Sequence, residues 1–146
     1  MGKTPERKLN RRQARDLDIE IGFLEGVVRR DPEFIEALQV LGDDYTERGR
    51  LADSLKVDER LRQLRPEDPN VLFNYACSLA LSGAMEQACG ELERALDLGY
   101  RDFRWLQRDP DLADLRKHPS YRKVKAKIKA LKEEAAPQGN VEADSP

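Results

Sequence analysis

The sequence predicts an all-α protein, an α-solenoid of antiparallel helix hairpins, and three observations support this prediction. The chain repeats itself with a period of 34 residues, which aligns Leu38 with Leu72 and Leu41 with Tyr75, and such a period is typical of stacked supersecondary units. Apolar residues recur at three- and four-residue intervals within each period, so they share one face of a helix. Gly49 stands between two such stretches, where a turn is expected.

Two full repeat units follow from this period. The first unit covers residues 35–68, with Leu38 on the apolar face of its first helix and Leu61 on that of its second. Gly49 marks the turn between these two helices. The second unit covers residues 69–102 and repeats the pattern one period later. Each unit is therefore expected to form a helix hairpin.

Further segments precede and follow the two units. Residues 16–34 carry a broad apolar face and predict the second helix of a degenerate leading repeat, whereas the basic residues 1–15 are expected to fray. Residues 103–132 contain helix-start signals and a last apolar stripe, so we expect a helical cap that seals the core of the last repeat. The composition of residues 133–146 predicts a disordered tail.

Composition agrees with one compact helical domain. The chain has 146 residues, of which 39% are hydrophobic, 37% charged and 6% aromatic, and this length supports one modest core. The longest uncharged stretch, residues 70–85, is too short and too polar to span a bilayer. No apolar signal core follows the basic N-terminus, so we expect a cytoplasmic protein with no membrane contact.

The repeat pattern resembles the tetratricopeptide repeat family, whose units combine a large apolar residue, Leu-Gly, Tyr, Ala, a second large residue, Ala and Pro. The first unit meets this pattern at Leu38, Leu41, Gly42, Tyr45, Ser54, Leu61 and Pro66. The second unit meets it at Leu72, Tyr75, Ala76, Leu79, Ala88, Leu92 and Ala95. Asp58 departs from the pattern at a large-residue position, and Tyr100 replaces the closing proline. Residues 99–116 resemble the closing motif of many bacterial members.

The resemblance implies a concave groove lined by the first helix of each unit. The positions that it assigns to this groove include Glu36, Gln39, Asp43 and Glu47, then Asn70, Phe73 and Cys77. Asn74 and, from the cap, Arg104 and Arg108 are further candidate contacts of the same groove. Such a groove would be acidic at its first end and apolar at its second. We therefore expect a protein or peptide ligand with basic residues beside a hydrophobic anchor.

Two other interpretations of these positions are open. The acidic residues can form an ordinary solvated face, with Phe73 and Leu81 part of the core. Some family members clamp a carboxylate with Lys, Asn and Arg, and Asn74, Arg104 and Arg108 match that arrangement. Gln39 and Asp43 break the match in the first unit, where the acid would repel a carboxylate.

No catalytic motif is recognisable, so we expect no enzymatic activity, no cofactor and no metal. Asp43 and Asp44 are adjacent on a helix and point about 100° apart, which prevents joint chelation, and Asp44 is expected in solvent. The motif Asp-Pro-Asp that begins at Asp109 is typical of helix capping. Cys77 and Cys89 lie in apolar context and are expected to be buried thiols.

Charge is segregated along the chain, and this leaves two alternative functions. Residues 1–15 carry a net charge of +5 and residues 116–132 one of +8, whereas residues 16–115 carry −11. The basic ends could bind the phosphates of a nucleic acid. The body would repel such a polyanion, and the last basic helix is needed for the cap. Alternatively, the basic end of one molecule could dock on the acidic groove of another and form head-to-tail chains.

Overall fold

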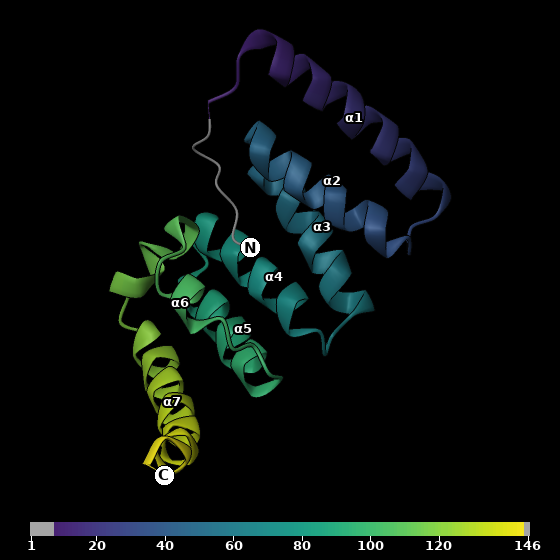
Figure 1. Cartoon of the computed structure of the whole chain (residues 1–146). Coiled ribbons are helices and arrows are strands. Elements are labelled where there is room, and N and C mark those ends of the chain that lie inside the picture. Colours follow the sequence, from purple (N-terminus) through teal and green to yellow (C-terminus); the bar gives the residue numbers. More distant parts are fainter. Residues whose placement is uncertain (1–7, 145–146) are drawn as a thin grey trace.

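The computed structural model is built of helices that pack beside their neighbours in sequence (Figure 1). It describes the backbone of residues 8–144 and the side chains of residues 8–135. The helices in chain order are α1 (Arg11–Arg30), α2 (Ile35–Arg48), α3 (Leu51–Leu64), α4 (Pro69–Leu81), α5 (Met85–Asp97), α6 (Phe103–Leu106), the 3₁₀ turns η1 (Pro110–Leu112) and η2 (Leu115–Lys117), and α7 (Tyr121–Asp144). The described residues contain no strand, so the all-α class is confirmed.

The two predicted hairpins are present. Helices α2 and α3 pack against each other, as do α4 and α5, and α3 also packs against α4. The turns contain Gly49 at φ 85° and Gly83 at φ 87°. Such positive φ values lie in the left-handed region, which glycine enters without steric cost. Both glycines therefore end the first helix of their hairpin as the sequence indicates.

The leading helix is longer than expected. Helix α1 begins at Arg11, so residues 11–15 belong to it and not to a frayed segment. The reason is a capping box at its start, in which the Gln13 amide donates to Asn10 Oδ1 at 2.7 Å and the Asn10 amide donates to Gln13 Oε1 at 3.0 Å. These bonds satisfy two backbone donors that a helix start otherwise leaves to solvent.

The last helix is also longer than expected. Helix α7 ends at Asp144 and thus extends into residues 133–146, the segment for which the composition predicts a disordered tail. Glutamate and alanine are good helix formers, and they continue α7 from Glu133 through Ala135. No helix in the described part of the chain combines the length and the apolar character that crossing a membrane requires.

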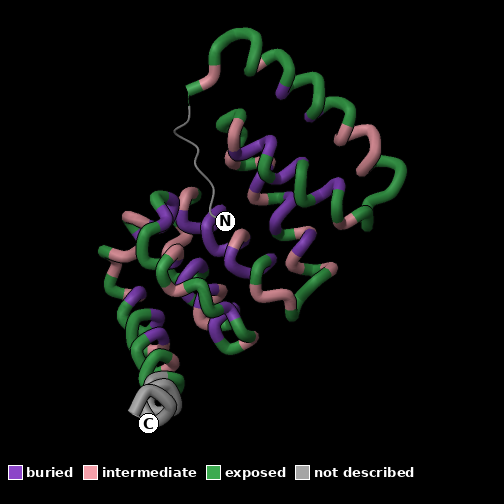
Figure 2. The backbone as a smooth tube through the Cα atoms, in the orientation of Figure 1, coloured by how far each residue is buried: buried purple, intermediate pink, exposed green. Residues whose placement is uncertain are grey.

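Most of the buried residues, purple in Figure 2, belong to two hydrophobic clusters. The smaller cluster joins α1, α2 and α3 to the start of α4 and consists of Leu17, Ile21, Leu38, Leu41, Tyr45, Val57, Leu61 and Val71. The larger cluster joins α4 and α5 to the cap and includes Leu72, Phe73, Ala76, Ala88, Leu92, Leu96, Leu106, Leu112, Leu115 and Val124. The cap thus closes the second hairpin: η1 packs on α4, and α7 packs on α5.

Candidate functional site

A small polar hollow lies between α2, α3 and α4. Its volume is about 210 Å³, and its lining residues are Gln39, Asp43, Asp58, Leu61, Asn70, Val71 and Asn74. Three of these, Gln39, Asp43 and Asn70, are positions that the repeat register assigns to the groove, and Asn74 is a further candidate contact from the sequence. The structure therefore brings together residues from both repeat units that lie far apart in sequence.

Helix geometry places these side chains at the hollow. Gln39 and Asp43 are four residues apart on α2, and Asn70 and Asn74 are four apart on α4, so each pair shares one helix face. Helix α4 starts with Pro69, and the Asp68 carboxylate accepts from the Asn70 amide at 2.9 Å. This cap sets where the first turn of α4 begins, and it thereby positions Asn70.

An acidic stripe extends along α2 beside the hollow. Glu36 and Asp43 are exposed, Glu47 is half-buried, and all three lie within one helix face. Val40 belongs to the same stripe and is 43% exposed. The exposed surface of α2 therefore combines three carboxylates with one apolar side chain.

Phe73 and Cys77 do not line an open groove. Phe73 is 2% exposed and Cys77 is completely buried. The Phe73 ring stacks on Tyr100 with a centroid distance of 4.6 Å, and the Cys77 thiol donates to Asp109 Oδ2 at 3.7 Å. The expectation of an apolar groove end is therefore corrected: the cap packs on α4 and covers Phe73 and Cys77.

The cap arginines stand apart from the hollow. Arg104, on α6, and Arg108, just after it, are both exposed, and neither lines the hollow. Asn74 does line it, together with the carboxylates of Asp43 and Asp58. The hollow is therefore acidic, which is unfavourable for a bound carboxylate.

Asp44 is buried, contrary to the expectation that it faces solvent. It is 8% exposed because α1 covers this side of α2. Burial, the nearby charge of Glu20 and a hydrogen bond with Glu20 raise the pKa of the Asp44 carboxyl to about 7. No sequence signal indicated this pair, since the packing of α1 on α2 decides which carboxylates of α2 are covered.

Asp58 is also buried at the edge of the hollow. Its side chain is 3% exposed and accepts a short hydrogen bond from the Ser78 hydroxyl. The bond joins α3 to α4, so the aspartate at a large-residue position of the repeat is used for polar packing. The departure from the repeat pattern at Asp58 was the sequence signal for this contact, although it did not identify Ser78.

The described residues contain one group with the spacing of metal ligands. Candidate ligand atoms of Cys77, Asp109 and Asp111 lie within 4.8 Å of one another, and all three residues are buried. Asp109 caps η1 as expected, accepting from the Asp111 amide at 2.9 Å. Burial raises the pKa of the Asp109 carboxyl, while this amide bond and the Cys77 thiol oppose the rise. These contacts account for the group as part of the cap.

The cysteines behave as buried thiols. Neither Cys77 nor Cys89 forms a disulfide, and both lie in the core. Burial, with a smaller effect of Glu93, raises the pKa of the Cys89 thiol to about 11. A thiol with so high a pKa is a poor nucleophile at neutral pH, which agrees with the expectation that this cysteine is structural.

Comparison with known proteins adds one relative. The chain is 29% identical over 96 residues to a chloroplastic protein of Arabidopsis thaliana. The match covers 64% of this chain and 27% of that protein, so it spans about a quarter of that protein's length. No family model matches the chain, and no solved structure matches it. Membership of the tetratricopeptide family stays a prediction from the repeat pattern.

Proposed function

We propose that this chain is a tetratricopeptide-type interaction module without enzymatic activity. In this proposal the paired helices stack as an α-solenoid, and a peptide or protein segment binds along α2 at the hollow between α2 and α4. The observation that carries the proposal is the meeting of Gln39, Asp43, Asn70 and Asn74 around that hollow. The repeat register selected Gln39, Asp43 and Asn70 from the sequence alone, and Asn74 was selected by its match to family members that clamp a carboxylate.

The chemistry of the surface favours a basic ligand. Asp43 and Asp58 contribute carboxylates to the hollow, and its other polar lining residues are amides. Glu36 and Glu47 extend the negative charge along α2. A lysine or arginine of the ligand would therefore be attracted to the hollow, and neighbouring polar groups could donate to or accept from Asn70.

Val40 supplies the apolar contact of the proposed surface. Phe73 is enclosed by the cap, so the hydrophobic anchor of a ligand cannot use it. Val40 is 43% exposed and lies between the carboxylates of the α2 stripe. A ligand with one apolar residue close to its basic residue would match this arrangement, so the proposal keeps the basic and hydrophobic character that the sequence indicates.

The proposal is tested with a fluorescent peptide library in which a lysine or arginine is adjacent to one apolar residue. Fluorescence polarisation measures binding to the full chain and to the double variant Asp43→Lys with Glu47→Lys. We expect at least about a tenfold loss of affinity in this variant, because both substitutions place a cation beside the binding cation. Far-ultraviolet circular dichroism should show unchanged helix content, since Asp43 is exposed and Glu47 half-buried.

A matched control separates the groove from net charge. The double variant Glu67→Lys with Glu86→Lys makes the same change in charge at two positions outside the hollow. Its affinity for the peptide should stay within about twofold of that of the natural chain, because salt screens the effect of charges that lie away from the contact. Equal losses in both double variants, or no peptide bound by the natural chain, would refute the groove proposal.

Nucleic acid binding through the basic α7 is less well supported. The exposed lysines of α7 include Lys125 and Lys129, but Lys127 already forms an ion pair with Asp97 at 2.7 Å. The apolar face of α7 packs on α5 as part of the cap. Titration with a random DNA pool at low and high salt distinguishes this function, since phosphate binding has a steep salt dependence.

A further inference from the structure

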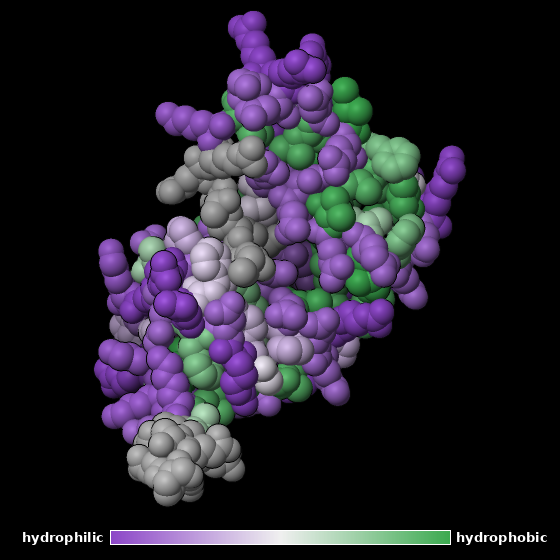
Figure 3. Space-filling model, in the orientation of Figure 1, coloured by the Kyte–Doolittle hydropathy of each residue, from purple (hydrophilic) through white to green (hydrophobic). Residues whose placement is uncertain are grey.

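The outward face of α1 exposes apolar side chains at one end of the molecule. Ile19 is 65% exposed and Phe23 is 70% exposed. Beside them is a hollow of about 370 Å³ lined by Gly22, Phe23, Gly26, Val27, Arg29 and Arg30. Figure 3 shows apolar side chains, in green, at the surface over the α1 and α2 end of the molecule. Exposure of two large apolar residues on one helix face points to a docking surface.

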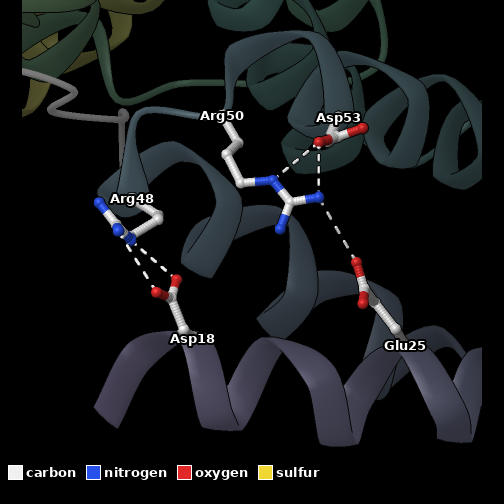
Figure 4. A network of polar contacts seen from close by, with 5 residues as sticks. All are labelled: Asp18, Glu25, Arg48, Arg50 and Asp53. Carbon is white, nitrogen blue, oxygen red and sulfur yellow. Dashed lines mark hydrogen bonds and ion pairs between the residues drawn. The ribbon is translucent and has the colours of Figure 1, made fainter. Parts of the chain in front are cut away.

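Contacts on the other side of α1 fix which face is outward. Leu17 and Ile21 are buried in the smaller cluster. At the margin of this inner face, Arg48 donates to Asp18 at 2.8 Å, and Arg50 lies 3.6 Å from Glu25 (Figure 4). With its inner face and this margin engaged, α1 cannot turn Ile19 and Phe23 inward without breaking these contacts.

Six residues form the outward stripe of α1. They follow one another at spacings of four, three, four, three and four, which keeps them on one helix face. The stripe consists of Arg12, Asp16, Ile19, Phe23, Gly26 and Arg30. Gly22 lies beside it, and a Cβ added to Gly22 or Gly26 would meet no atom within 4 Å. The centre of the stripe is therefore apolar. Its glycines carry no side chain, so a second helix can approach closely there.

We propose that this stripe is the interface of a symmetric dimer, in which α1 packs antiparallel against α1 of a second copy. The twofold axis passes beside Phe23, so that Phe23 contacts Phe23 of the second copy. Ile19 then lies opposite Val27 of the second copy, and Asp16 lies opposite Arg30. This surface is separate from the groove on α2 and α4.

The charges along the stripe favour the register centred on Phe23, and they favour a second copy of this chain as the binding partner. Centred on Phe23, the stripe forms two ion pairs with the second copy, because Asp16 of each copy faces Arg30 of the other. The competing register that pairs Ile19 with Phe23 brings Arg12 opposite Arg30, and like charges repel. An isologous contact of this kind closes after two copies, unlike the head-to-tail chains that charge segregation alone suggests.

The size of the contact sets the expected affinity. Helix α1 has 20 residues and is roughly 30 Å long, so one helix against one helix is smaller than a standard interface of about 800 Å² per partner. The aromatic pair at the centre is the expected hot spot. We therefore expect a dissociable dimer with a Kd on the order of micromolar.

Sedimentation velocity tests the dimer with the full chain, over concentrations from about 2 to about 200 μM, which bracket a micromolar Kd. The natural chain should shift from monomer to dimer. Phe23→Glu should raise the Kd at least about tenfold, because it places two like charges at the axis. Val40→Glu makes the same change of an apolar residue to glutamate at another exposed position, outside the α1 stripe, and should leave the Kd unchanged.

Cysteine cross-linking tests the register. Phe23→Cys should form an intermolecular disulfide under mild oxidation, because the two substituted positions meet at the axis within disulfide reach. Ile19→Cys is the matched control: its two sites are separated by roughly 12 Å along the helices, beyond that reach. The natural thiols of Cys77 and Cys89 are buried, so they do not contribute to the bands on a non-reducing gel.

A charge exchange completes the test. Asp16→Arg and Arg30→Asp should each raise the dimer Kd severalfold, and the double variant should restore it, since the pair is rebuilt with reversed signs. If the natural chain remains monomeric at about 200 μM, the dimer proposal is overturned, and the α1 stripe would instead be a docking surface for another protein. Cross-linking at position 19 but not at position 23, or no rescue in the double variant, overturns the register.

Discussion

The first three helices and the last four are held together by different means. Among the residues that the structure describes, the cluster of the α4–α7 region has 19 buried members, whereas the cluster that holds α1, α2 and α3 has 8, one of which, Val71, lies on α4. Helix α1 also makes polar contacts at its margins, where Tyr45 donates to Glu25 at 2.6 Å and Arg50 lies over the Tyr45 ring at 4.7 Å. Since buried apolar area dominates stability, the α1 end should open before the capped end.

The largest effect should come from the larger cluster. Leu92 is completely buried on α5, so Leu92→Ala should lower the free energy of unfolding by about 3 kcal/mol, from lost burial and the cavity that remains. Chemical denaturation followed by circular dichroism measures it. If the loss were below about 1 kcal/mol, the α4–α7 region would not be the stable part of the chain.

A smaller and more local effect is expected at Ile21, which is 1% exposed on α1. Ile21→Ala should lower the free energy of unfolding by about 2 kcal/mol. This value is at the low end for such substitutions, because the smaller cluster can collapse more easily around a cavity. Hydrogen exchange followed by mass spectrometry should show lost protection in α1 and α2 with α4 and α5 unchanged. Equal loss of protection in all helices would show that the chain opens as one unit.

The third effect depends on pH. Unfolded, the Asp44 carboxyl titrates near 3.8, and in the fold its pKa is about 7. Between these values the folded chain keeps a proton that the unfolded chain has lost, so the free energy of unfolding falls as pH rises from about 4 to about 7. Asp44→Asn should remove this decline and, at about pH 8, stabilise the chain by about 1 kcal/mol.

Thermal denaturation across this pH range measures the Asp44 effect. The comparison variant is Asp43→Asn, because Asp43 is the exposed neighbour of Asp44 on α2. Its charge makes the smallest of the contributions that raise the pKa of the Asp44 carboxyl, so this substitution should reduce the slope with pH only slightly. Parallel pH curves for Asp44→Asn and the natural chain would show that the covered carboxylate does not weaken the contact between α1 and α2.

The smallest effect should come from the ion pair between Arg48 and Asp18. Its side chains are 37% and 50% exposed, so solvent and salt screen the attraction. Arg48→Gln should leave the Tm unchanged within measurement error, and added salt should not alter the natural chain's Tm through this pair. A clear drop in Tm would mean that polar contacts, rather than the apolar seam, hold α1 in place.

The fold was predictable where local signals are strong, and the groove only in part. The period of 34 residues and the turn glycines indicated both hairpins, and the register selected Gln39, Asp43 and Asn70, which the structure places around one hollow. The apolar end of the groove was not predictable, because Phe73 and Cys77 lie on a face that the cap covers. Which helix covers a given face depends on packing between distant segments.

The sequence by itself determined the helices, their hairpin order and the presence of a cap, since helix periodicity, glycine turns and the Asp109 capping motif all act over a few residues. Only the tertiary structure decided whether each polar side chain is exposed or buried. Asp43 and Asp44 are neighbours with the same chemistry, yet Asp43 lines the hollow between α2 and α4, whereas Asp44 is buried against α1. The physical reason is that helix position sets the direction of a side chain, whereas the neighbouring helix sets whether water remains there.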